Sequence, residues 1–126
     1  PYSEFVLYAS PDENVALQNI GGIGNVTVLP STGNMADVYA FDTGPGNMII
    51  DEVMQRLYGC PYDEGGKVAA SGVVNAKMLD ELMSHPYISM PLPKSTGREM
   101  FGEQDTVAML DRWGSHARVP RLIDAL

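Results

Sequence analysis

The sequence has few basic residues, one cysteine and no long apolar segment, and these shortages exclude several classes of protein. Its 126 residues include 8 Lys and Arg against 16 Asp and Glu, which gives a formal net charge of −8. Nucleic-acid binding needs clustered Lys and Arg to displace counterions, so we expect no nucleic-acid partner. No apolar run could cross a membrane, and the first residues lack the basic start of a signal peptide, so we expect no membrane partner.

The shortage of cysteine and histidine excludes two further kinds of site. A lone cysteine, Cys60, cannot form an internal disulfide, and this fits a reducing cytoplasm. Two histidines and one cysteine, far apart in the chain, make no zinc pattern, and we assign no metal-ligating residue. The hydrophobic fraction of 44% is that of an ordinary globular domain with one modest core.

Apolar residues and turn signals predict three strands first and helices afterwards. Two β-rich runs, 15–20 and 26–29, flank the segment GGIGN, which is typical of a hairpin. A third strand is expected over 38–42, and the short connections make this three-strand sheet antiparallel. Residues 4–8 have the character of a short strand or the end of a helix.

The second half of the chain predicts helices, which we expect to pack on one face of the sheet. The first begins at Asn47, a favourable N-cap, and Gly59 ends it. Helical spacing of apolar residues predicts further helices over 73–84, from Asp105 and from near Pro120. Segments 60–72 and 90–102 have the composition of loops.

Two glycine-rich turns are candidates for ligand contacts. The glycines of NIGGIGN, 19–25, either supply the positive φ of a tight hairpin turn or let backbone N–H groups approach a phosphate. In DTGPGN, 42–47, Asp42 ends a strand just before a helix, and unpaired N–H groups at that helix start suit an anion. The alternative for Asp42 is a carboxylate that bonds its own turn or caps the helix.

A third loop, PKSTGRE at 93–99, brings two cations and two hydroxyls together. Such a set suits contact with a phosphate or a sugar carboxylate, and a charged surface loop is the alternative.

Four segments together resemble one known family, and the resemblance extends over nearly the whole chain. They are LQNIGGIGNVTVLP, AFDTGPGNMIID, YDEGGKVAASG and LPKSTGREMF, and their order and spacing are similar to those of the anhydro-N-acetylmuramic acid kinases. The resemblance implies membership of the sugar-kinase and actin superfamily, whose enzymes have two ribonuclease H-like domains around a cleft. The expected fold is therefore α/β, part of a ribonuclease H-like, actin-like ATPase domain: a three-strand antiparallel meander followed by helices.

The resemblance also implies a reaction. Family enzymes are cytoplasmic kinases, that is, phosphotransferases of peptidoglycan and cell-wall recycling, and they use ATP, Mg²⁺ and water. They open the 1,6-anhydro bond of anhydro-N-acetylmuramic acid and release N-acetylmuramic acid 6-phosphate. The aspartate of the DTGPGN motif, here Asp42, is taken as the base that activates water, a role that contributes about 10²–10⁴-fold.

The family motifs assign further roles by position. The hairpin resembles a phosphate-binding hairpin, and its expected ATP-binding residues are Asn19, Gly21, Gly22 and Asn25. Gly24 stands where family members usually have Ala. The expected substrate-binding residues are Thr43, Gly44, Gly46, Asn47 and Lys94.

Family enzymes are roughly three times as long as this chain, and two of their motifs are absent from it. Neither the phosphate loop of the first domain nor the later adenosine motif has a match here. We therefore expect residues 1–126 to be the front part of the second domain and to be inactive alone. Family members tend to be homodimers, so a homodimer is a further expectation.

Two other functions remain open on the sequence. A non-enzymatic module could hold a phosphorylated sugar or nucleotide with the same turns. A glycosidase could pair Asp42 with Asp51, Asp63 or Glu64, because two carboxyl groups about 5–10 Å apart are what that reaction needs. Dependence of ring opening on ATP separates the glycosidase from the kinase.

Overall fold

A computed structural model of the chain describes residues 1–101 and 103–114, and its strands precede most of its helices. After the helix α1 (Tyr2–Tyr8) come the strands β1 (Val15–Ile20), β2 (Ile23–Leu29) and β3 (Tyr39–Pro45). The later helices are α2 (Asn47–Tyr58), α3 (Lys67–Ala70), α4 (Ala76–Met83), α5 (Arg98–Phe101) and α6 (Glu103–Gly114). None of the described helices combines the length and the hydropathy that a membrane crossing requires.

The three strands form the antiparallel sheet that the sequence predicts, in the order β1-β2-β3. Gly21 and Gly22 connect β1 to β2, so the predicted hairpin is confirmed. Neither glycine has a positive φ, however, so turn geometry is not what requires glycine at this tip. The register shifts where Gly24 pairs with Gly44 while Asn25 pairs with Asp42, which leaves Thr43 as the extra residue of a β-bulge.

Helix α2 follows β3 directly, and its two ends are fixed in different ways. Its N-cap is Gly46, not Asn47 as predicted, because Asn47 already has helical geometry. Its last turn ends at Gly59 in the left-handed region, as predicted, with the Gly59 N–H donating to the carbonyl of Gln55. Val53 and Met54 are its buried side chains.

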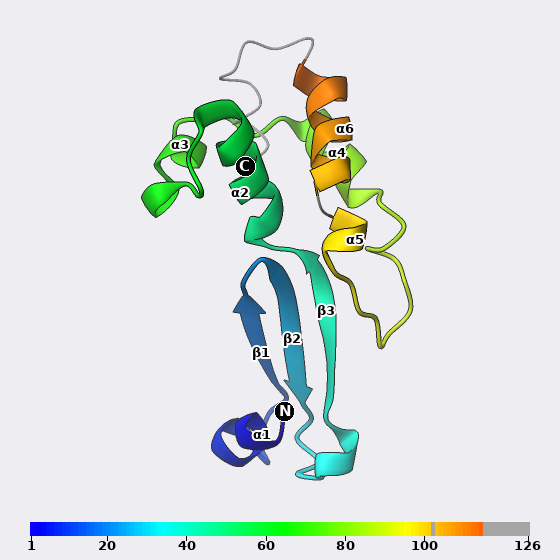
Figure 1. Ribbon diagram of the computed structural model, residues 1–126. Coiled ribbons are helices and arrows are strands. Elements are labelled where there is room, and N and C mark those ends of the chain that lie inside the picture. The colour runs from blue at the N-terminus through cyan, green and yellow to red at the C-terminus, as the bar shows by residue number, and fades with distance from the viewer. Residues whose placement is uncertain (102, 115–126) are drawn as a thin grey trace.

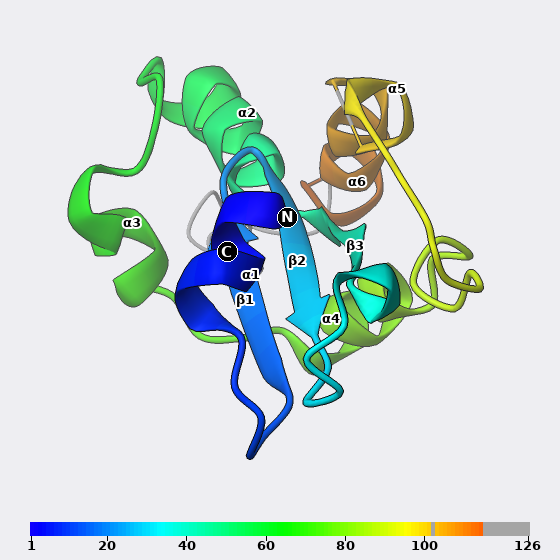
Figure 2. The same cartoon turned by 90° about the horizontal axis from the view of Figure 1, so that it is seen from below.

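The predicted packing of the helices on one face of the sheet is wrong. Figure 1 shows α2 to α6 gathered at the end of the sheet where the hairpin tip lies, and α2 continuing beyond β3. The physical reason is the short β3–α2 connection, which docks the start of α2 on the hairpin tip and carries the helix past the strands. Among the described helices, α1 packs against β2, at the end of the sheet away from the hairpin tip (Figures 1 and 2).

Several predicted boundaries also need correction. Residues 2–8 form a helix, the second of the two options that the sequence left open for 4–8, and α3 and α5 lie in segments predicted as loops. Helix α4 begins only after Asn75, whose side chain accepts a hydrogen bond from the Met78 N–H at 3.3 Å. Helix α6 begins at Glu103 rather than Asp105. The helix predicted near Pro120 lies outside the described residues.

The buried side chains come from both the strands and the helices. The ring of Tyr87 meets that of Phe101 edge to face, with centroids 5.4 Å apart. Tyr87 is the bulkiest of the fully buried residues. Its ring packs on α5 and its hydroxyl donates to the Asp42 carbonyl of β3, so it connects the two elements. The buried apolar residues are Val26, Leu29, Val53, Met54, Met78, Tyr87 and Phe101.

Candidate functional site

A row of three polar residues crosses the sheet. Asn19 of β1 pairs with Asn25 of β2, and Asn25 pairs with Asp42 of β3. Directly paired residues of antiparallel strands share one face of the sheet, so the register brings these three predicted site residues together. Among the described residues, neither Asn19 nor Asn25 has a hydrogen-bond partner for its side-chain amide. Both amides are therefore free to bind a ligand.

Asp42 is held from the side of β3 that faces away from β2. Its backbone N–H donates to the carbonyl of Lys94 at 3.0 Å, and its own carbonyl accepts from the Tyr87 hydroxyl at 2.8 Å. Its carboxylate oxygen Oδ2 accepts from the Ser95 hydroxyl at 3.1 Å and from the Thr96 N–H at 2.9 Å. Oδ1 has no partner in the described part of the chain. The half-buried carboxylate therefore keeps one oxygen for a ligand.

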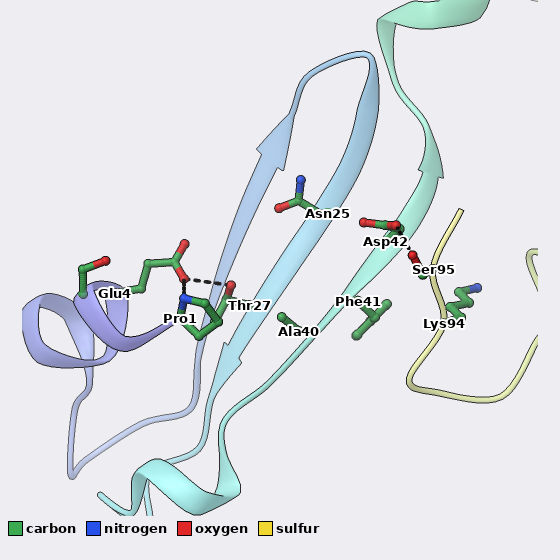
Figure 3. A pocket seen from close by; sticks show the side chains of 10 residues that line it. Pro1, Glu4, Asn25, Thr27, Ala40, Phe41, Asp42, Lys94 and Ser95 are labelled. Atoms are coloured by element: carbon green, nitrogen blue, oxygen red, sulfur yellow. Dashed lines mark hydrogen bonds and ion pairs between the residues drawn. The ribbon is translucent and has the colours of Figure 1, made fainter. Parts of the chain in front are cut away.

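A pocket of about 500 Å³ opens over this face of the sheet (Figure 3). Helix α1 bounds one side and the 94–95 segment the other, with Asn25 and Asp42 between them. Glu4 of α1 accepts a hydrogen bond from the Thr27 hydroxyl at 2.9 Å, and this bond lowers the pKa of Glu4. The residues that line the pocket are Pro1, Ser3, Glu4, Asn25, Thr27, Ala40, Phe41, Asp42, Lys94 and Ser95.

The start of α2 does not offer the free N–H donors that the sequence predicts. The N–H groups of Gly46 and Met48 donate to the carbonyl of Gly22 at 2.9 and 3.2 Å, and that of Asn47 donates to Gly21 at 2.9 Å. The hairpin tip supplies these acceptors from a distant part of the sequence. The N–H groups at the positive end of the helix dipole therefore bind carbonyl groups of the protein itself. The N–H of Gly22 itself has no acceptor among the described residues and is exposed.

The remaining predicted substrate-binding residues do not line the pocket, and they differ in exposure. Thr43 sits in the bulge with its hydroxyl 3.4 Å from the Gln18 amide nitrogen. Gly44 is buried, and a Cβ there would meet Ile88. Asn47 is exposed at the start of α2. Gly46 is closed off by the hairpin tip.

Lys94 lines the pocket, but its ammonium group has other partners. Nζ donates to the carbonyls of Tyr87 and Ile88, both at 2.9 Å, and lies 4.6 Å from the centre of the Tyr87 ring. These bonds attach the 94–96 segment to the turn that follows α4, which contains Tyr87 and Ile88.

Three of the residues that hold Asp42 are not among the predicted site residues: Tyr87, Ser95 and Thr96. Ser95 and Thr96 lie in a loop that the sequence singles out for its hydroxyl groups, so a weak signal existed for them. Tyr87 lies 45 residues from Asp42, and no local pattern connects the two.

The described part of the chain contains no group of three or more His, Cys, Asp and Glu side chains arranged to hold a metal ion. What the site offers is amide groups, one free carboxylate oxygen and the Gly22 N–H. Such groups suit hydrogen bonding to hydroxyl and phosphate oxygens, and the carboxylate can accept a proton.

Comparison with known proteins identifies relatives along almost the full chain. Residues 1–125 match the family model described as anhydro-N-acetylmuramic acid kinase. A curated protein of that name from Clostridioides difficile (strain 630) is 57% identical over 113 residues, 90% of this chain and 30% of the relative. Another from Bacillus thuringiensis subsp. konkukian is 55% identical over 118 residues, 94% of this chain and 31% of the relative. This chain thus spans less than a third of the length of these relatives.

Proposed function

The chain belongs to the anhydro-N-acetylmuramic acid kinase family, and from this we propose that the whole protein is an ATP-dependent kinase of anhydro-N-acetylmuramic acid. Its reaction would open the 1,6-anhydro bond with water and leave N-acetylmuramic acid 6-phosphate and ADP. The observation that carries the proposal for this chain is the carboxylate of Asp42, which presents an unpartnered oxygen beside a pocket and two free amides.

In the proposed reaction Asp42 acts as the general base. It takes a proton from water as the water oxygen bonds to the anomeric carbon, and the bond from that carbon to O6 breaks. O6 then bonds to the γ-phosphorus of ATP, and ADP leaves with the electrons of the broken P–O bond. Because water is a poor nucleophile at neutral pH, removal of its proton in the transition state contributes about 10²–10⁴-fold.

We propose that the hairpin side of the row binds the phosphates of ATP. The support is the pair of free amides, Asn19 and Asn25, together with the exposed Gly22 N–H at the tip. Because Asn25 pairs directly with Asp42, such a phosphate would lie beside the carboxylate that activates water. In-line transfer needs that closeness.

Mg²⁺ would fit this site only if the protein and the phosphates of ATP both supplied ligands to the ion. In the described residues no carboxylate cluster could hold it, so we expect phosphate oxygens and water to supply most of its ligands. The amide oxygens of Asn19 and Asn25 are donors of a kind that Mg²⁺ accepts. When bound, the ion would neutralise charge on the transferred phosphoryl group.

We further propose that residues 1–126 belong to the second of two ribonuclease H-like domains. The three-strand antiparallel sheet followed by helices supports this, as does the chain's span of about 30% of its relatives. We also propose that the whole protein forms a homodimer and acts in the cytoplasm, in the recycling of the cell wall.

The test is Asp42→Asn in the full-length protein. We expect kcat to fall by about 10²–10⁴-fold with little change in the KM for ATP, because the amide cannot take the proton. Asp51→Asn is the matched control, since Asp51 is a half-buried carboxylate on α2 that does not line the pocket. Full activity of Asp42→Asn would overturn the assignment of the base.

The same assay separates the alternatives. A glycosidase would open the anhydro ring without ATP, whereas the kinase needs ATP for product to form. A binding module would hold the sugar or the nucleotide without turnover in the unmodified protein.

A further inference from the structure

We propose that Ser95 is a positioning residue that orients the carboxylate of Asp42, so that Oδ1 faces the pocket. The inference rests on the proposed function, in which Asp42 is the base. It starts from one geometric fact: two donors from a segment far along the chain, the Ser95 hydroxyl and the Thr96 N–H, meet on the same oxygen, Oδ2. Figure 3 shows the Ser95 side chain beside the Asp42 carboxylate.

An aspartate side chain on a strand is otherwise free to rotate its carboxylate. The terminal torsion of Asp is broad, so the two oxygens exchange places readily unless hydrogen bonds distinguish them. Here the Ser95 hydroxyl, at 3.1 Å, and the Thr96 N–H, at 2.9 Å, both select Oδ2. Donors to an ionised oxygen form the stronger class of hydrogen bond, so this pair defines one orientation.

The segment that carries these donors is itself fixed by contacts that do not involve its hydroxyl. The Lys94 carbonyl accepts from the Asp42 N–H at 3.0 Å, which adds the segment to the edge of β3. The Lys94 ammonium is bound by the carbonyls of Tyr87 and Ile88. Removal of the Ser95 hydroxyl should therefore leave the backbone of the segment in place.

Of the two donors, Ser95 is the one that a side-chain substitution removes. Thr96 contributes its backbone N–H, which every substitution except proline retains. The Ser95 side chain is exposed, so its truncation leaves no internal cavity and should not weaken the fold. A change in rate after truncation would therefore report on the orientation of Asp42.

The expected effect is on kcat rather than on substrate binding. A base that samples a second orientation spends part of its time unable to reach the water, and small misplacements of reacting groups cost up to about 10²-fold. We expect Ser95→Ala to lower kcat by about 10- to 100-fold. The KM values for ATP and for the anhydro sugar should each stay within about twofold, because Ser95 contacts neither in this assignment.

The experiment compares three variants of the full-length protein by steady-state kinetics and thermal unfolding. Ser95→Thr keeps the hydroxyl and should recover most of the rate lost in Ser95→Ala. Ser89→Ala is the matched control, because the exposed Ser89 hydroxyl donates to the Pro86 carbonyl at 3.2 Å and has no contact with Asp42. The control should keep the kcat of the unmodified protein.

A crystal structure of Ser95→Ala gives a readout that does not depend on turnover. We expect the Asp42 carboxylate to occupy more than one orientation in it. An unchanged kcat, an equal loss in Ser95→Thr, a rise in KM without a fall in kcat, or a single unchanged carboxylate orientation would each overturn the inference. Absence of turnover in the unmodified protein would instead overturn the proposed function, and the crystal structure would still decide the role of Ser95.

Discussion

Substitution of Gly46 by alanine tests the contact between the hairpin tip and the start of α2. A Cβ on Gly46 would overlap the carbonyl oxygen of Gly21 and would also lie 3.4 Å from that of Gly22. Both neighbours are backbone atoms, which cannot swing aside as a side chain would. The substitution should therefore push the hairpin tip and the helix apart.

The magnitude follows from the bonds that this separation breaks. Three N–H groups, of Gly46, Asn47 and Met48, donate to the tip carbonyls at 2.9, 2.9 and 3.2 Å. Each such bond contributes about 0.5–1.5 kcal/mol net, so the loss of two or three should lower the free energy of unfolding by about 1–4.5 kcal/mol. Urea unfolding followed by far-UV circular dichroism measures this difference.

The tip glycines provide the controls. A Cβ on Gly22 would approach nothing nearer than the Cβ of Met48 at 4.0 Å, and one on Gly21 nothing nearer than the Ile23 carbonyl at 3.7 Å. Neither glycine has a positive φ, so alanine at either position should change the free energy of unfolding by less than about 0.5 kcal/mol. If Gly46→Ala is no more destabilising than Gly22→Ala, the close contact described here does not exist.

Two further predictions concern single hydrogen-bonding groups. Tyr87→Phe removes the hydroxyl that donates to the Asp42 carbonyl and should lower the free energy of unfolding by about 1–3 kcal/mol. Tyr39→Phe, at a residue that is 45% exposed, should have no measurable effect in the same urea titration, and equal effects would refute the reasoning. Hydrogen bonds from two backbone N–H groups of α3 lower the pKa of Asp63 below its ordinary value. That contribution to stability is complete above the unfolded pKa of about 3.9 and is lost as pH falls through the lower folded pKa. The melting temperature of Asp63→Asn should therefore lie furthest below that of the unmodified protein near pH 7, and a gap that stays constant down to about pH 2.5 would contradict the assignment.

The sequence predicts well what depends on neighbouring residues. The hairpin follows from glycines between two β-rich runs, and the end of α2 follows from Gly59. Asn19, Asn25 and Asp42 were each predicted as site residues from motifs, and the sheet register then explains why they lie together. The four-residue helix α3 was missed because so short a segment shows no periodicity.

Contacts between distant segments account for the errors. Free N–H groups at the start of α2 were a reasonable prediction, but the acceptors at Gly21 and Gly22 come from another part of the chain. The Ser95 hydroxyl reaches Asp42 across 53 residues, and no spacing rule predicts that approach. Contact of Lys94 with substrate stays a prediction: Lys94 lines the pocket, and the carbonyls of Tyr87 and Ile88, which no spacing rule predicts as its partners, accept from its ammonium group.

The contact between Gly46 and the hairpin tip fixes the length of the chain between Gly44 and α2. Thr43 is the extra residue of the bulge, Gly44 lies opposite Gly24, and Gly46, two residues later, meets the carbonyls of Gly21 and Gly22. One inserted residue would rotate the helix start by about 100°. Loop 30–38, which is mostly exposed, carries no such requirement. We therefore expect natural and laboratory variants to tolerate length changes in that loop and to reject insertions between residues 44 and 47.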